Sequence, residues 1–517
     1  MNNSLKKCVR RALIVGFLNG LMAGGFEMHR AFAQDAVGLF SGNTNSGNSD
    51  VGNPKLAGST EYDSEKQRYT LTGAGFNMWD ARDEFQFDWK KLKGDFLIQA
   101  QVKFVGEGVD PHRKIGVIVR SSLDAEAPYA DVAVHGDGLV SLQYRKTKGA
   151  ATEQIEASIT HADVVQLERK GNTYTMSVAK FGEEFVTEEI ADLDLGEEVY
   201  AGLFICSHNP EVVEEAVFSN VRIIVPAADD FVPYQDFIGS NLEVMDVATG
   251  ERHVVHQVTD SLQAPNWTRD GEALIYNHNG RLYRFDLANK KIVEIDTDFA
   301  TNNNNDHVLS FDGAMLAISH HPEEFDRHSV IYTVPTTGGK PKQITAGEYH
   351  SYLHGWSPDG KWLVFTGGRN DNYDIYKIPA AGGEEVRLTT YEGLDDGPEY
   401  SPDGETIYFN SMRSGKMQIW RMNADGSGQQ QVTDDEHNNW FPHISPDGEW
   451  IVYIAFPTDI DPADHPFYKH VTLRLMPVGG GPAKIIAYLY GGQGTINVPS
   501  WSPDGKRIAF VSNSVIE

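Results

Sequence analysis

Histidine and carboxylate side chains recur at matched places in the second half of this chain. Six similar short turns occur there, and each follows one large residue: Trp267, Leu309, Trp356, Tyr400, Ile444 or Trp501. His307 and His354 lie two positions before that residue, whereas Glu399 and His443 lie one position before it. Imidazole and carboxylate groups from separate segments can converge on a divalent metal ion, so these four residues form the candidate metal set.

Other polar and aromatic residues precede the same turns and complete the candidate ligand-binding set: Asn305, Asp306, Tyr352, Asp395, Asp396, Trp440 and Asn497. Eleven of the thirteen histidines after residue 238 map to the same face of the expected fold, with His253 and His256 as the exceptions. Three interpretations stay open. The face is a metal site, a sugar cleft in which Trp440 or Tyr352 stacks on the ligand, or a set of loops that cap a water-filled channel.

The turns themselves predict the architecture that positions these residues. S-P-D-G stands at 357–360, 401–404, 445–448 and 502–505, and T-R-D-G and S-F-D-G at 268–271 and 310–313 are variants. Proline presets φ, and glycine takes the left-handed conformation that closes a hairpin. The turn glycines are spaced 42 to 57 residues apart. A period in the forties is typical of four-stranded propeller blades.

The strand pattern predicts six blades in a closed ring. Each turn is followed by a strand of period two, and every hairpin except the last is followed by a second pair of strands. The missing pair stands at the front, in the segment 241–259. We therefore expect these N-terminal strands to complete the last blade, because closure removes exposed sheet edges.

Two stretches also carry a resemblance to a known family. W-S-P-D-G-K and "DIYKIPAAGGEEVRLT" resemble the propeller repeats of TolB, a periplasmic protein of the Tol-Pal envelope system, over residues 239–517. The resemblance implies a six-bladed propeller and a scaffold for protein–protein interaction. TolB carries an α/β domain ahead of its propeller, and the segment ahead of this propeller has a different pattern.

Residues 50–225 alternate with period two and predict a second all-β domain. The closing pair, "YAGLFICS" and "AVFSNVRIIV", is similar to the end of concanavalin-like and laminin-G-like sandwiches, which implies a jelly roll. Residues 34–49 are expected to be a flexible lead-in, and residues 226–238 a linker. The segment "NMWDARDEF" is a weaker candidate for a sugar or calcium contact, through Trp79, Asp80, Arg82 and Asp83.

Residues 1–33 predict an export signal that is cleaved after Ala33. Basic residues precede an apolar stretch from Ala12 to Phe26, and Ala31-Phe32-Ala33 follows as a small-x-small site. The apolar stretch is too short for a transmembrane anchor. We therefore expect a periplasmic or secreted protein.

Charge limits the classes of partner. The whole chain carries a net charge of −29; the first 33 residues hold five basic residues and one acidic residue, so the remainder carries −33. Nucleic acids and anionic membranes need a basic face, so the composition excludes both. The sequence also lacks a nucleophile elbow and a phosphate loop.

These observations favour an exported protein that binds a carbohydrate or glycoconjugate, in polysaccharide utilisation, at the histidine-rich mouth of the propeller channel. The sequence favours a binding protein over an enzyme. One alternative is a metal-dependent polysaccharide lyase or hydrolase, since oligogalacturonate lyases are propellers that hold a divalent ion with channel histidines. Another alternative is a TolB-like scaffold whose partner is an envelope protein.

Overall fold

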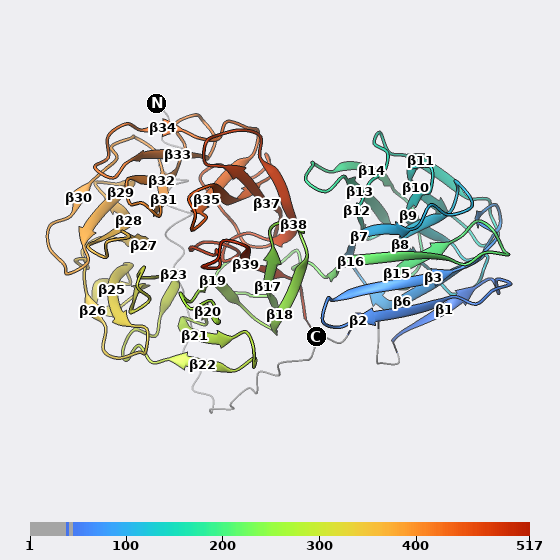
Figure 1. Cartoon of the computed structure of the whole chain (residues 1–517), viewed down its shortest axis with the longest axis horizontal. Helices are drawn as coiled ribbons and strands as arrows, with labels where there is room; N and C mark the ends of the chain where they lie inside the picture. The colour runs from blue at the N-terminus through green and yellow to red at the C-terminus, as the bar shows by residue number, and fades with distance from the viewer. Residues whose placement is uncertain (1–37, 41–44, 517) are drawn as a thin grey trace. The chain divides into compact units, whose positions relative to one another are not determined.

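The computed structural model of the chain describes residues 38–40 and 45–516 (Figure 1). The described residues form two compact units, which divide between Pro226 and Ala227. The predicted export signal, 1–33, and the first residues of the predicted lead-in lie outside the described residues. Within the described residues, no helix is both long enough and apolar enough to cross a membrane.

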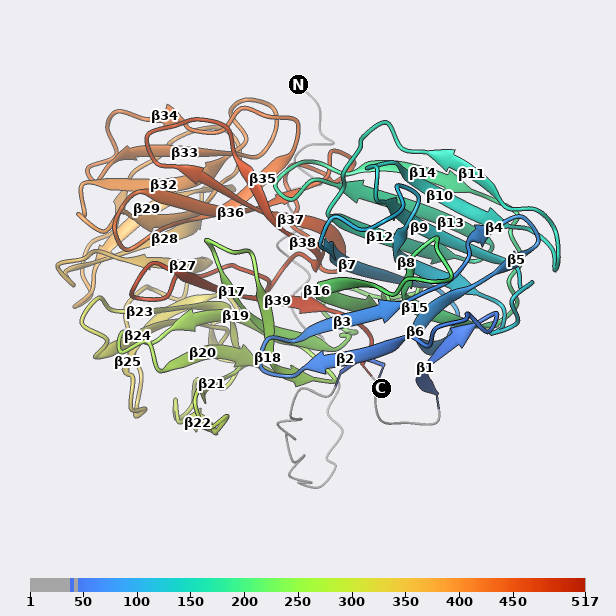
Figure 2. The same cartoon turned by 45° about the vertical axis from the view of Figure 1, so that its right-hand side comes forward.

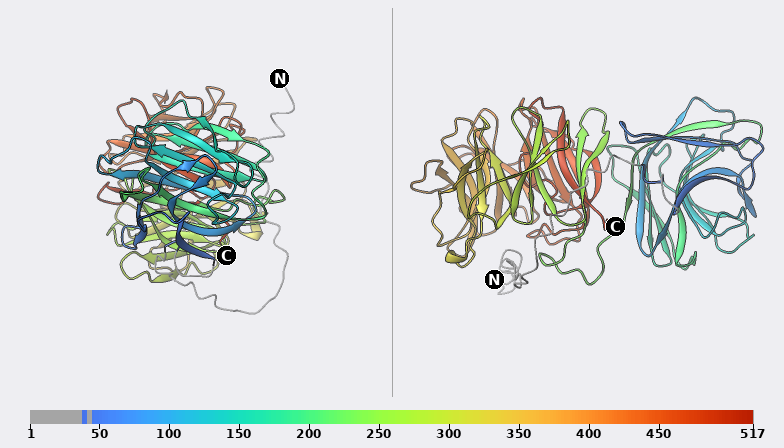
Figure 3. Two further views of the ribbon diagram at one scale, coloured as in Figure 1. Left: turned by 90° about the vertical axis from the view of Figure 1, so that its right-hand side faces the viewer. Right: turned by 90° about the horizontal axis from the view of Figure 1, so that it is seen from below.

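Two antiparallel sheets build the first unit, and their inner faces share one hydrophobic core (Figure 3). The first sheet has the order β1 (Ser46–Val51), β6 (Phe85–Lys93), β15 (Glu198–Cys206), β8 (Lys114–Arg120), β9 (Tyr129–His135), β10 (Val140–Arg145), β11 (Glu153–Glu156). The second has the order β14 (Val186–Ile190), β13 (Thr173–Ala179), β12 (Val164–Lys170), β7 (Phe96–Val105), β16 (Glu214–Ile224), β3 (Arg68–Gly73), β2 (Ser59–Asp63). The all-β prediction is confirmed, and the concanavalin-like assignment stays a prediction.

Two local features of the first unit add to the sequence expectations. β4 (Met78–Trp79) and β5 (Arg82–Asp83) form a short hairpin (Figure 2). β1 pairs with β6, so residues 46–49 lie in a strand and not in a flexible lead-in. Pairing satisfies the backbone groups of this glycine-rich segment, which composition alone did not reveal.

The second unit is a ring of six blades, which confirms the predicted propeller (Figure 1). Blades 1 and 2 are β19 (Leu262–Trp267), β20 (Ala273–His278), β21 (Arg281–Asp286), β22 (Ile292–Ile295), and β23 (Asn303–Leu309), β24 (Met315–His320), β25 (Val330–Pro335), β26 (Lys342–Gln343). A short 3-10 helix, η1 (Glu323–Phe325), lies between β24 and β25. Blades 3 and 4 are β27 (Ser351–Trp356), β28 (Trp362–Arg369), β29 (Asn372–Pro379), β30 (Val386–Arg387), and β31 (Asp395–Tyr400), β32 (Thr406–Ser411), β33 (Gln418–Asn423), β34 (Gln430–Gln431). Blade 5 is β35 (Asn438–Ile444), β36 (Trp450–Phe456), β37 (Lys469–Pro477), β38 (Lys484–Gly491).

Blade 6 joins segments from the two ends of the propeller sequence. β18 (Arg252–Val258), β17 (Ser240–Asp246) and β39 (Arg507–Asn513) form its sheet in that order. β17 pairs with β39 over seven residues, and Trp501 adds an isolated bridge to Ile508. The strands that precede blade 1 therefore complete blade 6.

Each S-P-D-G turn is a self-contained hydrogen-bonded unit. In blade 3, Ser357 Oγ donates to Asp359 Oδ1 at 2.6 Å, and the same carboxylate oxygen accepts from the Lys361 amide at 3.0 Å. The hydroxyl also accepts from the Trp362 amide at 2.9 Å, and Gly360 has a φ of 71°. Because these bonds stay within the turn, the turn closes the hairpin without help from other segments.

Register shifts interrupt the inner strand of five blades. β19, β23, β27, β31 and β35 each contain a shift against their neighbouring strand. A shift leaves extra residues out of the ladder and turns their side chains. These bulges decide which inner-strand residues meet.

Candidate functional site

Bulged residues from three blades form the centre of the candidate site. His354 lies in the bulge of β27, between the paired residues Leu353 and Gly355. Asp306 lies in the bulge of β23, and Phe441 in that of β35. The rings of His354 and Phe441 stack with centroids 6.0 Å apart. We call Asp306, His354, Asp396 and Phe441 the inner-strand cluster.

A buried ion pair lies within this cluster. His354 Nε2 is 3.4 Å from Asp396 Oδ1, and both side chains are buried. The same carboxylate oxygen accepts from Thr366 Oγ1 at 2.6 Å and from the Gly397 amide at 2.7 Å. These donors fix Asp396, which in turn orients the imidazole of His354.

The electrostatics of the cluster favour the charged forms of His354 and Asp396 and shift the pKa of Asp306 toward neutrality. Burial lowers the pKa of His354, but the charges of Asp306 and Asp396 and the hydrogen bond to Asp396 outweigh burial and hold this pKa above its ordinary value. Burial raises the pKa of Asp396, but the hydrogen bond and charge of His354 keep it below its usual range. Burial raises the pKa of Asp306 to about 6, with the charge of His354 opposing and that of Asp396 adding to the rise.

Aromatic residues and a further histidine surround the cluster. The ring of His465 lies 5.2 Å from that of Phe441, and its Nδ1 has no hydrogen-bond partner among the described residues. Burial raises the pKa of Tyr352, and the Tyr373 hydroxyl and the charges of Asp306 and Asp396 add to the rise, so Tyr352 lies near these groups.

The segment that leads into the propeller also reaches this region. Tyr234 has a φ of 64°, and its ring contacts that of Phe467 with centroids 5.2 Å apart. Burial raises the pKa of Tyr234, with contributions from the charges of Asp464 and Asp306. The segment 227–239 therefore contributes a side chain to the surroundings of Asp306.

His307 was predicted to be equivalent to His354, and the structure corrects this. His307 follows the bulge of its strand and pairs with Ile318, whereas His354 is itself the bulged residue. The His307 ring is fully buried, with Nδ1 3.0 Å from the Asn305 carbonyl and Nε2 3.2 Å from the Ile275 carbonyl. Burial lowers its pKa to about 4, so His307 is a neutral structural residue.

Glu399 and His443 form a separate structural clasp between blades. His443 Nδ1 is 2.5 Å from Glu399 Oε2, and His443 Nε2 is 2.6 Å from the Ile496 carbonyl. Glu399 Oε1 accepts from the Ile444 amide at 3.2 Å. Both ring nitrogens face oxygen atoms, so neither is open to a metal ion.

The predicted metal set is therefore not assembled. Its members lie in three different environments, and His354 contacts Asp396 instead of the other three residues. Among the residues that the structure describes, no group of three or more histidine, cysteine or acidic residues has the geometry to hold a metal ion. The spacing in the sequence predicted that these side chains lie together. In the structure, the bulges place them in different environments.

Four further residues of the predicted ligand-binding set have structural partners or are buried. Trp440 is fully buried in a hydrophobic cluster, so it offers no open platform for stacking. Asp395 is buried and accepts from Arg413 Nη2 at 2.7 Å. Asn497 bonds to the Gly494 amide and to Gln493, whereas Asn305 is buried and its Nδ2 has no partner in the part of the chain that the structure describes.

Comparisons with known proteins identify the family. Residues 324–460 match the family model described as the TolB beta propeller domain. The curated "Uncharacterized protein Atu1656" of Agrobacterium fabrum (strain C58) is 46% identical over 279 residues, which cover 54% of this chain and 94% of that protein. The chain belongs to the TolB-like β-propeller family.

One solved structure extends this comparison to the fold. A structure from Agrobacterium tumefaciens, named as a candidate TolB, is 44% identical, covers 54% of this chain and 100% of that chain, and has a TM-score of 0.51. TolB from Acinetobacter baumannii is 17% identical over 49% of this chain and 64% of its own, with a TM-score of 0.37.

Sequence reasoning missed two contributors to the site of this TolB-like propeller. Phe441 follows Trp440 directly, but its φ of 52° places it in the bulge, which the period-two pattern does not predict. Tyr234 lies in the segment that was assigned as a linker. The aromatic content of "FVPYQDF" was the one available indication that this segment packs against the propeller.

One residue of the weaker candidate site at the front, Asp83, has structural partners. Asp83 is fully buried and bonds to Arg145 Nη2 at 2.7 Å and to Arg120 Nη1 at 3.1 Å. Because both guanidinium groups hold its carboxylate, Asp83 anchors the β4–β5 hairpin and is not open to calcium or sugar.

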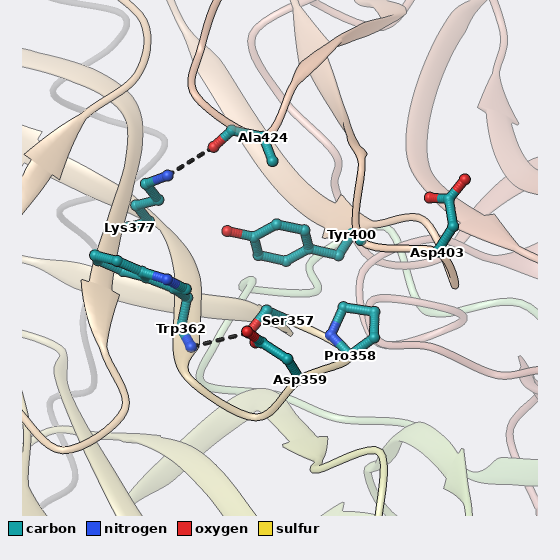
Figure 4. A pocket seen from close by; sticks show the side chains of 9 residues that line it. Ser357, Pro358, Asp359, Trp362, Lys377, Tyr400, Asp403 and Ala424 are labelled. Atoms are coloured by element: carbon teal, nitrogen blue, oxygen red, sulfur yellow. Dashed lines mark hydrogen bonds between the residues drawn. The ribbon is translucent and has the colours of Figure 1, made fainter.

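A pocket of about 280 Å³ lies between blades 3 and 4 (Figure 4). Trp356 and Trp501 donate from Nε1 to carbonyls of the preceding blade at 3.0 Å, and Tyr400 occupies the equivalent place in blade 4. Figure 4 shows the Tyr400 ring beside Trp362 and Lys377, and Lys377 Nζ donates to the Ala424 carbonyl at 2.7 Å. The phenol ring of Tyr400 is smaller than the indole that stands at the equivalent place in blades 3 and 6.

Proposed function

We propose that this chain is an exported binding protein whose TolB-like propeller holds a segment of an envelope protein at the inner-strand cluster. The observation that carries the proposal is the buried His354–Asp396 pair beside Asp306, on strands that line the centre of the ring. Buried charges cost folding free energy, so their presence points to a binding role. Membership of the TolB-like family supports a protein partner, and the predicted export signal supports a location in the periplasm or outside the cell.

The two competing functions each lose part of the residue set on which they depended. A sugar cleft in the propeller needs an open aromatic face; of its two candidate residues, Trp440 is fully buried and Tyr352 is partly exposed. A metal-dependent lyase needs a ligand set, and both ring nitrogens of His307 and His443 face oxygen atoms. We therefore favour protein binding.

The test compares the full chain with His354→Gln in capture of envelope proteins, followed by titration calorimetry with the purified captured protein. The matched control is His253→Gln, because His253 lies on β18 outside the cluster. We expect His354→Gln to weaken binding at least tenfold and the control to bind normally. A captured protein that binds both variants equally, or capture of none, contradicts the proposal.

A further inference from the structure

A short segment of the propeller unit lies against the candidate site without being part of a blade. Residues 227–238 immediately precede Gly239 and β17, and they belong to the same compact unit as the propeller. The structure describes all of them; none belongs to a strand, and each is at least partly exposed. We call residues 227–238 the strap.

Aromatic side chains attach the strap to the long loop of blade 5 that joins β36 to β37. The ring of Phe231 contacts that of Tyr468, with centroids 4.9 Å apart. The rings of Tyr234 and Phe237 both contact Phe467, at 5.2 Å and 5.8 Å. All three pairs meet edge to face, an arrangement that aromatic rings favour. Side-chain packing therefore holds the strap, in place of a strand ladder.

Tyr234 brings the strap close to the inner-strand cluster. Burial raises the pKa of Tyr234, and the charges of Asp464 and Asp306 add to this rise. The Tyr234 hydroxyl in turn adds to the rise that burial causes in the pKa of Tyr352. Electrostatic effects of this kind weaken with distance, so Tyr234 lies near both Asp306 and Tyr352. A partner segment bound at the inner-strand cluster would therefore compete with Tyr234 for space.

The backbone hydrogen bonds of the strap allow it to detach. The Val232 carbonyl accepts from the amides of Gln235 at 3.2 Å and Asp236 at 3.0 Å, so these bonds stay within the strap. The amides of Ala227 and Ile238, at its two ends, donate to tyrosine hydroxyls of the propeller, each at 3.1 Å. Water can accept the same two bonds, so the strap can leave while every blade keeps its strand pairing.

The backbone of Tyr234 favours release of the strap. Its φ of 64° lies in the left-handed region, which a bulky side chain rarely adopts. A residue held in this conformation is strained, and such strain is typical of segments that clamp a ligand or change state. Detachment relieves the strain, so the strain lowers the free energy that a partner must supply to displace the strap.

We propose that the strap is an intramolecular competitor of the protein partner, and that the partner displaces Tyr234 and packs an aromatic residue of its own against Phe467. This inference rests on the proposed function, because the partner is the protein whose segment binds at the inner-strand cluster. A covalently attached strap acts at a high effective concentration, so a segment without matching aromatic contacts does not displace it. Tyrosine or tryptophan fits this place best, because its donor can bond to a nearby carboxylate.

Titration calorimetry with the captured envelope protein compares the full chain with Tyr234→Ala. Loss of the ring weakens the competitor and raises the fraction of chains with an open site, so we expect at least about tenfold tighter binding. The matched control is Val232→Ala in the same strap, because the Val232 side chain is 42% exposed; its affinity should not change. Equal or weaker binding by Tyr234→Ala overturns the proposal, and so does a gain of the same size in the control.

A synthetic peptide of residues 227–239 tests the strap without the envelope protein. Fluorescence anisotropy measures binding of the labelled peptide to the full chain and to the Tyr234→Ala chain. We expect at least about tenfold tighter binding to the Tyr234→Ala chain, because the strap of the unmodified chain already fills the site. The same peptide with Tyr234→Ala should lose this binding. A peptide that binds neither chain, or both chains equally, overturns the role of the strap.

The two assays distinguish failure of the strap from failure of the proposed function. Capture of no envelope protein contradicts the proposed function, while the peptide assay still decides the role of the strap. Capture that depends on His354, without any effect of Tyr234→Ala and without peptide binding, leaves the proposed function standing and overturns the strap. Tyr234 lies outside the blade strands, so its variants keep the strand pairing. Tyr234→Phe keeps the ring and should bind the envelope protein as the unmodified chain does.

Discussion

His307 and His354 occupy the same place relative to the repeated turn, yet only His354 joins the cluster of charged residues. The bulge of β23 ends before His307, whereas the bulge of β27 contains His354. Sequence spacing predicted which residues stand near the ring centre, and the structure brings together Asp306, His354 and Asp396 from that set. An alternating sequence pattern does not show where a strand shifts its register by one residue, so it could not distinguish His307 from His354.

Asp306 gives a prediction with a defined pH dependence. Its folded-state pKa of about 6 lies above the ordinary 3.8, so the carboxylate costs stability above pH 6 and this cost disappears as pH falls below 3.8. Asp306→Asn should therefore raise the free energy of unfolding of the propeller at pH 8 by about 3 kcal/mol, because each pKa unit is worth about 1.36 kcal/mol. Urea denaturation at pH 8 and pH 4 measures the difference.

Asp396→Asn serves as the control for this experiment. The pKa of Asp396 is held below its usual range, so its charge stabilises the folded chain above pH 3.8 and that stabilisation is lost as pH falls below this value. This variant should lower stability at pH 8. A gain in both variants, or an Asp306→Asn effect of equal size at pH 4, contradicts the assigned electrostatics.

At the scale of single elements, the bulges are the feature that the sequence could not supply. The turns follow from local chemistry, since proline, aspartate and glycine each have a defined conformational preference. A bulge depends on how one strand pairs with its neighbour, so local sequence rarely reveals it. Among the five inner-strand bulges, only that of β31 contains a glycine, Gly397, which has a φ of 58°. The other bulges contain residues such as Asp306, His354 and Phe441, whose identities reflect the site and not the backbone.

Two glycine substitutions distinguish the energetic cost of a positive φ from the cost of a steric contact. Gly397 and Gly448 both have positive φ, 58° and 75°, so alanine at either costs about 1 kcal/mol in conformational energy. A Cβ on Gly397 would also meet Asn410 Nδ2 and the Phe441 ring, whereas a Cβ on Gly448 meets nothing within 4 Å. Gly397→Ala should therefore be the more destabilising by chemical denaturation. Equal losses would show that the bulge adapts to a methyl group.

At the scale of the whole molecule, the sequence predicted the number of blades and the pairing of the first strands with the last. Both follow from counting turns and strand pairs. The burial of Asp131, Ser141 and Gln143 in the first unit was not predicted, because these residues alternate with core residues and match an ordinary solvent-facing pattern.

Truncation tests the independence of the two units. Removal of residues 507–517 deletes β39, which β17 requires as its partner. We expect the propeller to become sensitive to limited proteolysis, while residues 45–226 stay resistant because they have their own core. A protease-resistant propeller after truncation would show that closure by β39 is dispensable.

The pairing of β17 with β39 also sets the order in which the chain reaches its final state. Ser240 leaves the ribosome long before its partner Asn513 has been made. The first unit contains its full set of strands by residue 226 and can fold while synthesis continues, whereas blade 6 must wait for the end of the chain. The unpaired edge of β17 is then exposed through most of translation, so newly made chains need protection from aggregation until the last strand arrives.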